Sequence, residues 1–350
     1  MSEPFGAPTK DFTVEVEAIL PEATSLTDSK GVEEAVNLLL TMEKKCRTNN
    51  DTKNLKLVCL HMMKMCKKKG DWTKLNAVIL LIHKRNTQSK MTISAVVAEA
   101  LLYLEDTPSL EVKIELIKTL KEICEGKIYV EGESAHLHFM LSKIYEGQGN
   151  IDDACDIIQD VHVETYGALT KKEKAVYILE QIRLNLLKKD YIRALISSRK
   201  MNLKTIEEEG FTEVKIKYYT MMVEYHTVEK DVWNISQAYS KIAASSEGAE
   251  QKVAIESAIT FLLMSKFDNE QSDMMYRIQK QLTTDYKAIS LDPIYSAALG
   301  FFTTSEIIPS PFVGQDIMES HIHLVRYIPA TVDIKAFFIS ELRNRVVQVR

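Results

Sequence analysis

The chain contains little glycine or proline for its length and no long apolar run. Its 350 residues include 12 Gly and 8 Pro, too few for the many tight turns of an all-β fold. The longest apolar run falls far short of the roughly 20 residues that a membrane-spanning helix needs. The N-terminal sequence MSEPFGAPTKDF lacks the apolar core of a secretory signal. We therefore expect neither an all-β fold nor a membrane span nor a signal peptide.

Charge and cysteine content exclude further classes. The 44 basic and 49 acidic side chains give a net charge of -5, which provides no electrostatic reason to expect nucleic acid or an anionic membrane as the main partner. Five cysteines form an odd number, scattered along apolar helical stripes, as is typical of reduced core residues. They are Cys46, Cys59, Cys66, Cys124 and Cys155. This usage predicts a cytoplasmic and nuclear protein.

The usual motifs of catalysis and of ion binding are missing. The sequence contains no GxxxxGK[ST], GxSxG, HExxH or CxxC, and no GxGxxG following a strand. Two pairs of alternating histidines, His136 with His138 and His321 with His323, lack the serine and aspartate that a metalloprotease with this start would need downstream. Alternating residues of a helix point to different sides, so we expect one exposed and one buried histidine. We predict no catalytic residue, no metal and no cofactor.

Short amphipathic helices fill most of the chain. In the segment from Gly126 to Met201, one apolar stripe repeats at helical spacing, and the sequence Gly147 to Asn150 interrupts it. That stripe consists of Leu137, Met140, Leu141, Ile144 and Tyr145. Similar stripes follow and precede it. Because such helices are marginal alone in water and apolar on one side, they must stack on neighbours, which indicates a helical-repeat protein.

A polar turn followed by a large apolar residue recurs at a regular interval. The apolar residues are Val32, Trp72, Ile151, Tyr191 and Val232. Their separations are 72 − 32 = 40, 151 − 72 = 79, 191 − 151 = 40 and 232 − 191 = 41, and 79 is about two periods. A period near 40 residues is typical of one helix pair per repeat in an α-solenoid. Three residues after each apolar position lies the residue expected at the contact within a pair: Ala35, Leu75, Ala154, Ala194 or Ile235.

The two ends of the chain are less regular. Residues 1–28 carry three prolines among Ser and Thr, and we expect a mostly flexible lead-in. Residues 29–290 hold the repeats. The final segment, 291–350, reads as a partial module, in which 332–338 is either a short strand or a frayed helix and 340–347 a helix just begun. The cations Lys67 to Lys69 precede Gly70 as a helix stop, which we favour over a nucleic-acid patch.

Three long blocks resemble one family. They are EGKIYVEGESA from Glu125, VETYG from Val163 and KFDNEQSD from Lys266. Together with colinear similarity from about Val36 to Ile308, they resemble the PCI-domain scaffold subunits of the 26S proteasome lid. A related scaffold subunit of the COP9 signalosome is the nearest alternative, and the VETYG and KFDNEQSD blocks favour the proteasome. A free, tetratricopeptide-like adaptor that grips peptide tails is a further alternative.

The resemblance implies a fold and a role. The fold is an all-α, right-handed solenoid of helix pairs, followed by a PCI module. We expect the winged helix of this module to be missing or rudimentary here, because the segment Arg345 to Val347 opens it in the family and the sequence stops at Arg350. The role is a non-catalytic scaffold in a hetero-oligomer that degrades ubiquitinated proteins. Its partners are other PCI subunits, the deubiquitinating metalloprotease pair, the ATPase ring and the core particle. Resemblance and exposure suggest as contact residues Phe267, Asp268, Asn269, Glu270, Gln271, Arg343 and Arg345.

Overall fold

The computed structural model describes residues 10–29, 31–266, 268–284, 286, 289, 291–303, 311, 314–321 and 332–348. Within these ranges, all regular secondary structure is helical and no β-strand occurs. The predicted all-α helical-repeat fold is therefore confirmed. None of the described helices is both long enough and apolar enough to cross a membrane.

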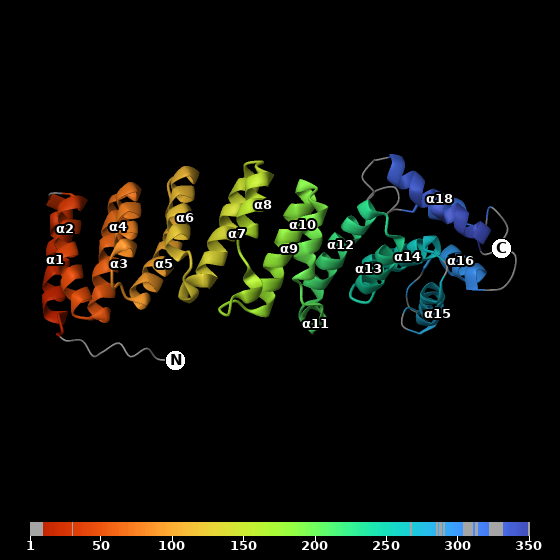
Figure 1. Cartoon of the computed structure of the whole chain (residues 1–350), viewed down its shortest axis with the longest axis horizontal. Coiled ribbons are helices and arrows are strands. Elements are labelled where there is room, and N and C mark those ends of the chain that lie inside the picture. Colours follow the sequence, from red (N-terminus) through yellow and green to blue (C-terminus); the bar gives the residue numbers. More distant parts are fainter. Residues whose placement is uncertain are drawn as a thin grey trace. The chain divides into compact units, whose positions relative to one another are not determined.

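The chain divides into two compact units. Figure 1 labels the helices and colours them in chain order. The first unit, Met1–Leu169, contains α1 (Thr13–Ser29), α2 (Val32–Thr48), α3 (Thr52–Lys69), α4 (Trp72–Lys84), α5 (Lys90–Tyr103), η1 (Leu104–Asp106), α6 (Leu110–Cys124), η2 (Ile128–Val130), α7 (Glu131–Gly147), α8 (Ile151–Gln159) and η3 (Val163–Thr165). The second unit, Thr170–Arg350, contains α9 (Lys171–Lys188), α10 (Tyr191–Arg199), α11 (Leu203–Ile206), α12 (Thr212–Glu229), α13 (Val232–Ala243), α14 (Gly248–Met264), α15 (Asn269–Thr283), α16 (Pro293–Thr303), α17 (Gln315–Glu319) and α18 (Val332–Gln348).

Most helices pack on a sequence neighbour, and several also contact a helix of the next pair. In the first unit, α3 contacts α1 and α5, while α4 contacts α6. In the second unit, α9 contacts α12, and α13 contacts α14. Contacts limited to adjacent pairs are the defining feature of a repeat protein, whose stability is a sum over pairs and their interfaces.

The predicted junctions are the observed helix starts. Helices α2, α4, α8, α10 and α13 begin at the five apolar residues of the 40-residue spacing. Four of them are capped by the preceding side chain, and Asp71, for example, accepts a hydrogen bond from the Lys74 backbone N–H at 2.9 Å. The residues three positions into these helices, from Ala35 to Ile235, are all at most 2% exposed. A local capping signal and a buried contact thus set the repeat.

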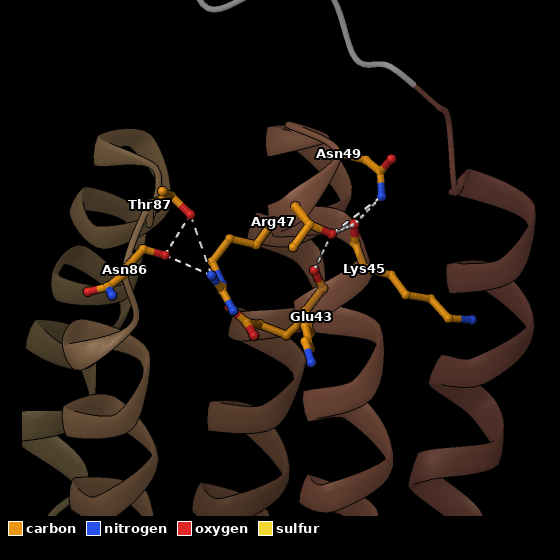
Figure 2. A network of polar contacts seen from close by, with 8 residues as sticks. Glu43, Lys45, Arg47, Asn49, Asn86 and Thr87 are labelled. Atoms are coloured by element: carbon orange, nitrogen blue, oxygen red, sulfur yellow. Dashed lines mark hydrogen bonds and ion pairs between the residues drawn. The ribbon is translucent and has the colours of Figure 1, made fainter.

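Some hydrogen bonds join a side chain of one helix pair to the backbone of the next pair, and they also span about one repeat. Figure 2 shows one such network, in which the Arg47 side chain at the end of α2 reaches the loop after α4. Its Nη1 donates to the Asn86 carbonyl oxygen at 2.7 Å, and its Nε donates to Glu43 Oε1 at 2.9 Å. Ion pairs such as Lys74 with Glu33 at 3.0 Å also span about one repeat. These contacts fix the register between neighbouring pairs.

The expectation of a flexible lead-in over residues 1–28 is wrong for residues 13–28, which belong to α1. Val16 and Ala23 of this helix are buried against α2 and α3. The Phe12 backbone N–H also donates to Asp51 Oδ2 at 3.1 Å. Burial of one apolar side of α1 outweighs the hydrogen bond that Pro21 removes from its interior. The N-terminal residues 1–9 lie outside the described part.

The C-terminal segment 332–348 is a single helix, so the alternative of a short strand at 332–338 is wrong. Phe338 and Leu342 of α18 are fully buried. The Phe338 ring meets the Phe261 ring of α14 edge to face, with centroids 5.5 Å apart. This segment therefore shares one hydrophobic core with α13 and α14. A helix is favoured here because it buries apolar side chains of one face against α14.

Candidate interaction surfaces

The predicted contact residues around α15 divide into structural and exposed side chains. Asp268 is the N-cap of α15 and accepts a hydrogen bond from the Gln271 backbone N–H at 2.7 Å. Asn269 and Glu270 in the first helical turn are exposed. Phe267 lies outside the described residues. Among the predicted residues of the helix itself, Asn269 and Glu270 are thus the exposed side chains of α15.

Gln271 was expected at a contact surface, and its burial makes this expectation wrong. Its side chain is fully buried, and its Nε2 donates to the carbonyl oxygens of Leu262 at 2.9 Å and Ser265 at 3.2 Å. Leu262 lies in the last turn of α14 and Ser265 is its C-cap, and the Leu262 carbonyl oxygen also accepts a hydrogen bond from the Ser265 backbone N–H at 3.1 Å. Gln271 therefore joins α14 to α15 instead of facing outward.

Arg343 on α18 is exposed and already holds an ion pair. Its Nε and Nη2 donate to the two oxygens of Glu319 on α17, each at 3.0 Å. The hydrogen bonds from Arg343 lower the pKa of Glu319. Arg345 lies in α18, and its side chain is outside the described part. The two halves of the predicted surface, on α15 and α18, both pack on α14.

The histidine pairs take up structural positions. His136 is exposed and His138 is buried, as predicted from their alternation. His138 Nδ1 lies 2.7 Å from the Ser134 carbonyl oxygen, and burial lowers the pKa of this histidine. His321 lies between the hydroxyls of Ser257 and Tyr295, while His323 is outside the described part. Among the described residues, no group of His, Cys, Asp or Glu side chains is arranged to hold a metal ion.

The lysine run that ends α3 is used within the fold. Lys67 pairs with Asp106 at 2.5 Å and Lys69 with Asp28 at 2.8 Å. Gly70 ends the helix with a left-handed backbone, φ 70°. These pairings support the interpretation as a helix stop over a nucleic-acid patch.

A groove of about 1050 Å³ on the first unit was not predicted from the sequence. Its buried lining includes Ser134, His138 and Leu141 of α7. Its other lining residues come from α6, from residues 125–128, from further positions of α7, from α8 and from the segment after α8. Part of this lining belongs to the EGKIYVEGESA block, whose charged and aromatic residues were the available signal. The groove combines an apolar floor with charged walls.

A smaller hollow of about 390 Å³ on the second unit is lined by aromatic side chains. The rings of Tyr218 and Tyr219 of α12 meet edge to face with centroids 5.2 Å apart, and Trp233 of α13 also lines the hollow. Burial raises the pKa of both tyrosines. Both hydroxyls therefore stay protonated at neutral pH.

Comparison with known proteins finds a matching family and several similar proteins. Residues 34–251 match the family described as PSMD12/CSN4, N-terminal. The chain is 32% identical over 291 residues to the 26S proteasome non-ATPase regulatory subunit 12 of Dictyostelium discoideum, covering 82% of this chain and 64% of that protein. It is 33% identical over 310 residues to homolog B of the same subunit in Arabidopsis thaliana, covering 81% and 69%. It is 30% identical over 315 residues to the 26S proteasome regulatory subunit RPN5 of Saccharomyces cerevisiae, covering 87% and 68%.

The similarity covers only part of these relatives. The chain spans less than two thirds of the length of the D. discoideum protein. Among solved structures, BtubC from P. vanneervenii aligns over 73% of this chain and 92% of its own, at 13% identity and a TM-score of 0.26. That score is too low to support an inference.

Proposed function

Because the chain belongs to the PSMD12/CSN4 family, we propose that it is a non-catalytic scaffold subunit of the 26S proteasome lid. The observation that carries this proposal is the match of residues 34–251 to the family, combined with relatives that are named as regulatory subunits of the proteasome. In this role the chain supports the degradation of ubiquitinated proteins through protein contacts, in the cytoplasm and the nucleus.

The architecture suits several simultaneous partners. A stack of helix pairs exposes a large surface for its length. The total surface of the stack is larger than the roughly 1,600 Å² that a standard interface buries. The proposed partners are other PCI subunits, the deubiquitinating metalloprotease pair, the ATPase ring and the core particle. Segment 291–350 would then be the partial PCI module. Asn269, Glu270 and Arg343 are the described residues that we propose for contacts.

Native mass spectrometry of an affinity-tagged copy, purified from the cells that the chain comes from, tests the proposal. Recovery with proteasome lid subunits at fixed stoichiometry is the expected result. Recovery with COP9 signalosome subunits would favour the alternative within the same family. A lone monomer, or a monomer with assorted short peptides, would contradict the scaffold role and favour the free adaptor.

The contact residues need a separate test. Glu270→Arg on α15 should reduce recovery of lid subunits, since it reverses the charge of an exposed side chain in the first helical turn. Glu111→Arg is the matched control, because Glu111 is an exposed acid in the first turn of α6 and loses the same favourable interaction with the helix dipole. Equal recovery with both variants would remove α15 from the proposed surface.

A further inference from the structure

Lys127 occupies an unusual position between the groove of the first unit and the end of α4. The chain reverses after α6 at Gly126, whose φ is 69°, and this turn brings the Lys127 side chain back over the helix end. Its Nζ donates to the Ile123 carbonyl oxygen and lies 3.1 Å from His83 Nδ1. Lys127 also lines the groove. Lys127 therefore borders the groove, and its amine lies beside an imidazole.

The surroundings of Lys127 differ from those of the chain's paired lysines. Lys74, Lys171 and Lys241 each lie within 3.0 Å of a carboxylate oxygen, which favours the charged, unreactive ammonium. In the described part of the chain, Lys127 has no such ion pair. Burial lowers its pKa, opposed by the nearby Cys124. Burial also raises the pKa of the Cys124 thiol to about 12, so that this thiol is protonated and does not compete as a nucleophile.

His83 can act as the base for this amine. A lysine ammonium has three donors and no acceptor, so the 3.1 Å contact requires Nδ1 of His83 to accept. That nitrogen then carries a lone pair. Burial and the Lys127 charge lower the pKa of His83, Lys84 lowers it further, and Glu122 raises it. A nucleophile within hydrogen-bonding reach of a neutral base is the arrangement that activates amines and hydroxyls.

We propose that Lys127 is an acylation site, whose Nζ attacks acyl thioesters that enter the groove, with His83 as proton acceptor. The ammonium first loses one proton to solvent, and the neutral amine attacks the thioester carbonyl. As the N–C bond forms, His83 Nδ1 takes a proton from the attacking nitrogen. The C–S bond then breaks, and the thiolate leaves with the proton from the imidazolium. The products are an acyl-lysine amide and a free thiol.

Acylation changes the contact between two repeats. The amide nitrogen is uncharged and keeps a single N–H, so it cannot serve both His83 and the Ile123 carbonyl oxygen. The acyl group has to lie in the groove that Lys127 lines. The modification thus weakens the link between α4 and the segment after α6 and fills a surface that is otherwise open to a partner. This inference goes beyond the scaffold role and does not depend on it.

Site-resolved acetylation kinetics test the proposal on the intact chain. The protein is incubated with acetyl-coenzyme A at pH 7.5 and digested, and acetylation at each lysine is quantified by mass spectrometry. Rates are normalised to those in urea, which removes the effect of local sequence. Lys127 is expected to react roughly threefold or more faster than Lys118 and Lys121, because His83 takes up the proton that the attacking amine releases. These two lysines line the same groove. Equal or slower reaction at Lys127 would overturn the proposal.

Two histidine variants test the role of the base. His83→Gln keeps a hydrogen-bond acceptor beside Nζ but takes up no proton, so the Lys127 rate should fall to that of Lys121. His136→Gln, at an exposed histidine of α7, should leave the rate unchanged. Melting temperatures of both variants show whether the fold is retained. A fast Lys127 in a folded His83→Gln variant would refute the proposed base.

Discussion

Arg47 donates from Nη1 to the carbonyl oxygen of Asn86 at 2.7 Å, across 39 residues of chain. The same guanidinium donates from Nε to Glu43 Oε1, so one side chain links α2 to the loop that ends the next helix pair (Figure 2). Glu43 is only 1% exposed, and its Oε2 has no hydrogen-bond partner among the described residues. The negative charge of the buried Glu43 carboxylate is thus compensated by Arg47.

Removing Arg47 should therefore destabilise the first unit strongly. Arg47→Ala leaves a buried carboxylate without its counter-charge, and we expect a loss of roughly 3–5 kcal/mol in the free energy of unfolding. Urea denaturation followed by circular dichroism measures this loss. Lys45→Ala is the control, because Lys45 on the same helix pairs with Glu15 at an exposed site and should lose at most about 1 kcal/mol.

A double variant separates charge compensation from packing. Glu43→Leu combined with Arg47→Met removes both charges and keeps apolar volume, so it should recover most of the lost stability. If Arg47→Ala costs no more than Lys45→Ala, the buried ion pair does not stabilise the repeat junction.

Two lysines hold a backbone conformation that favours glycine. Lys189 and Lys230, at the ends of α9 and α12, have φ of 63° and 59°. Lys189→Val should destabilise by roughly 1–2 kcal/mol, since a β-branched side chain fits the left-handed region poorly. Lys189→Gly should be neutral or slightly stabilising, because relief of this strain offsets the entropy of glycine in the unfolded chain.

The neighbouring residue provides the control for this prediction. Lys188→Gly, still inside α9, should cost about 1 kcal/mol as glycine does within a helix. Thermal melts of the three variants give the order. A destabilising Lys189→Gly with a neutral Lys188→Gly would contradict the assigned helix end.

Sequence reasoning predicted the local signals well and the long-range contacts poorly. The starts of α4, α10 and α13 could be predicted because an aspartate cap and the 40-residue spacing are written in adjacent residues. Helix α1 was missed, since its burial depends on α3 more than twenty residues further on. Trp72 is large and apolar but only partly buried, so its truncation to Ala should cost less than the roughly 3–5 kcal/mol of a buried tryptophan.

The candidate surfaces show the same division. Asp268 lies in a polar segment whose composition predicts an exposed turn, and its side chain is exposed. Gln271 is equally polar in the sequence, but its side-chain amide is buried and donates to carbonyl oxygens at the C-terminal end of α14. Only the three-dimensional packing shows this. The pairing of His83 with Lys127 joins residues 44 apart, and no short motif announces it.

Buried His321 should make stability depend on pH. Its Nε2 lies 3.0 Å from Ser257 Oγ and its Nδ1 2.7 Å from Tyr295 Oη, and burial lowers its pKa from 6.5 to about 4. A lowered pKa means that the unfolded chain binds more protons between these values. The contribution is therefore complete above pH 6.5 and is lost as the pH falls towards 4. The whole shift corresponds to about 3 kcal/mol.

Replacing His321 should flatten this profile. His321→Gln lowers stability at pH 7.5, because it disrupts buried hydrogen bonds, but it should reduce the change in unfolding free energy between pH 7 and 4. Exposed His136→Gln should leave the profile unaltered. Denaturation midpoints at half-unit pH steps give both curves. Parallel curves for wild type and His321→Gln would argue against a neutral, buried imidazole.

The small residues at the repeat contacts should resist enlargement equally in both units. Ala154 of α8 and Ala194 of α10 are at most 2% exposed, and the Ala154 carbonyl oxygen accepts a hydrogen bond from Ser142 Oγ of α7 at 2.9 Å. Leucine at either position forces its helix away from its partner, and we expect a loss of roughly 1–3 kcal/mol from each variant.

The control lies on the same helix as Ala194. Ile192 is 76% exposed, so Ile192→Leu should change the unfolding free energy by no more than about 0.5 kcal/mol. Because each alanine lies at the contact within its own helix pair, the losses from Ala154→Leu and Ala194→Leu should add within about 0.5 kcal/mol in a double variant. Strong non-additivity would mean that each substitution disturbs more than the contact within its own pair.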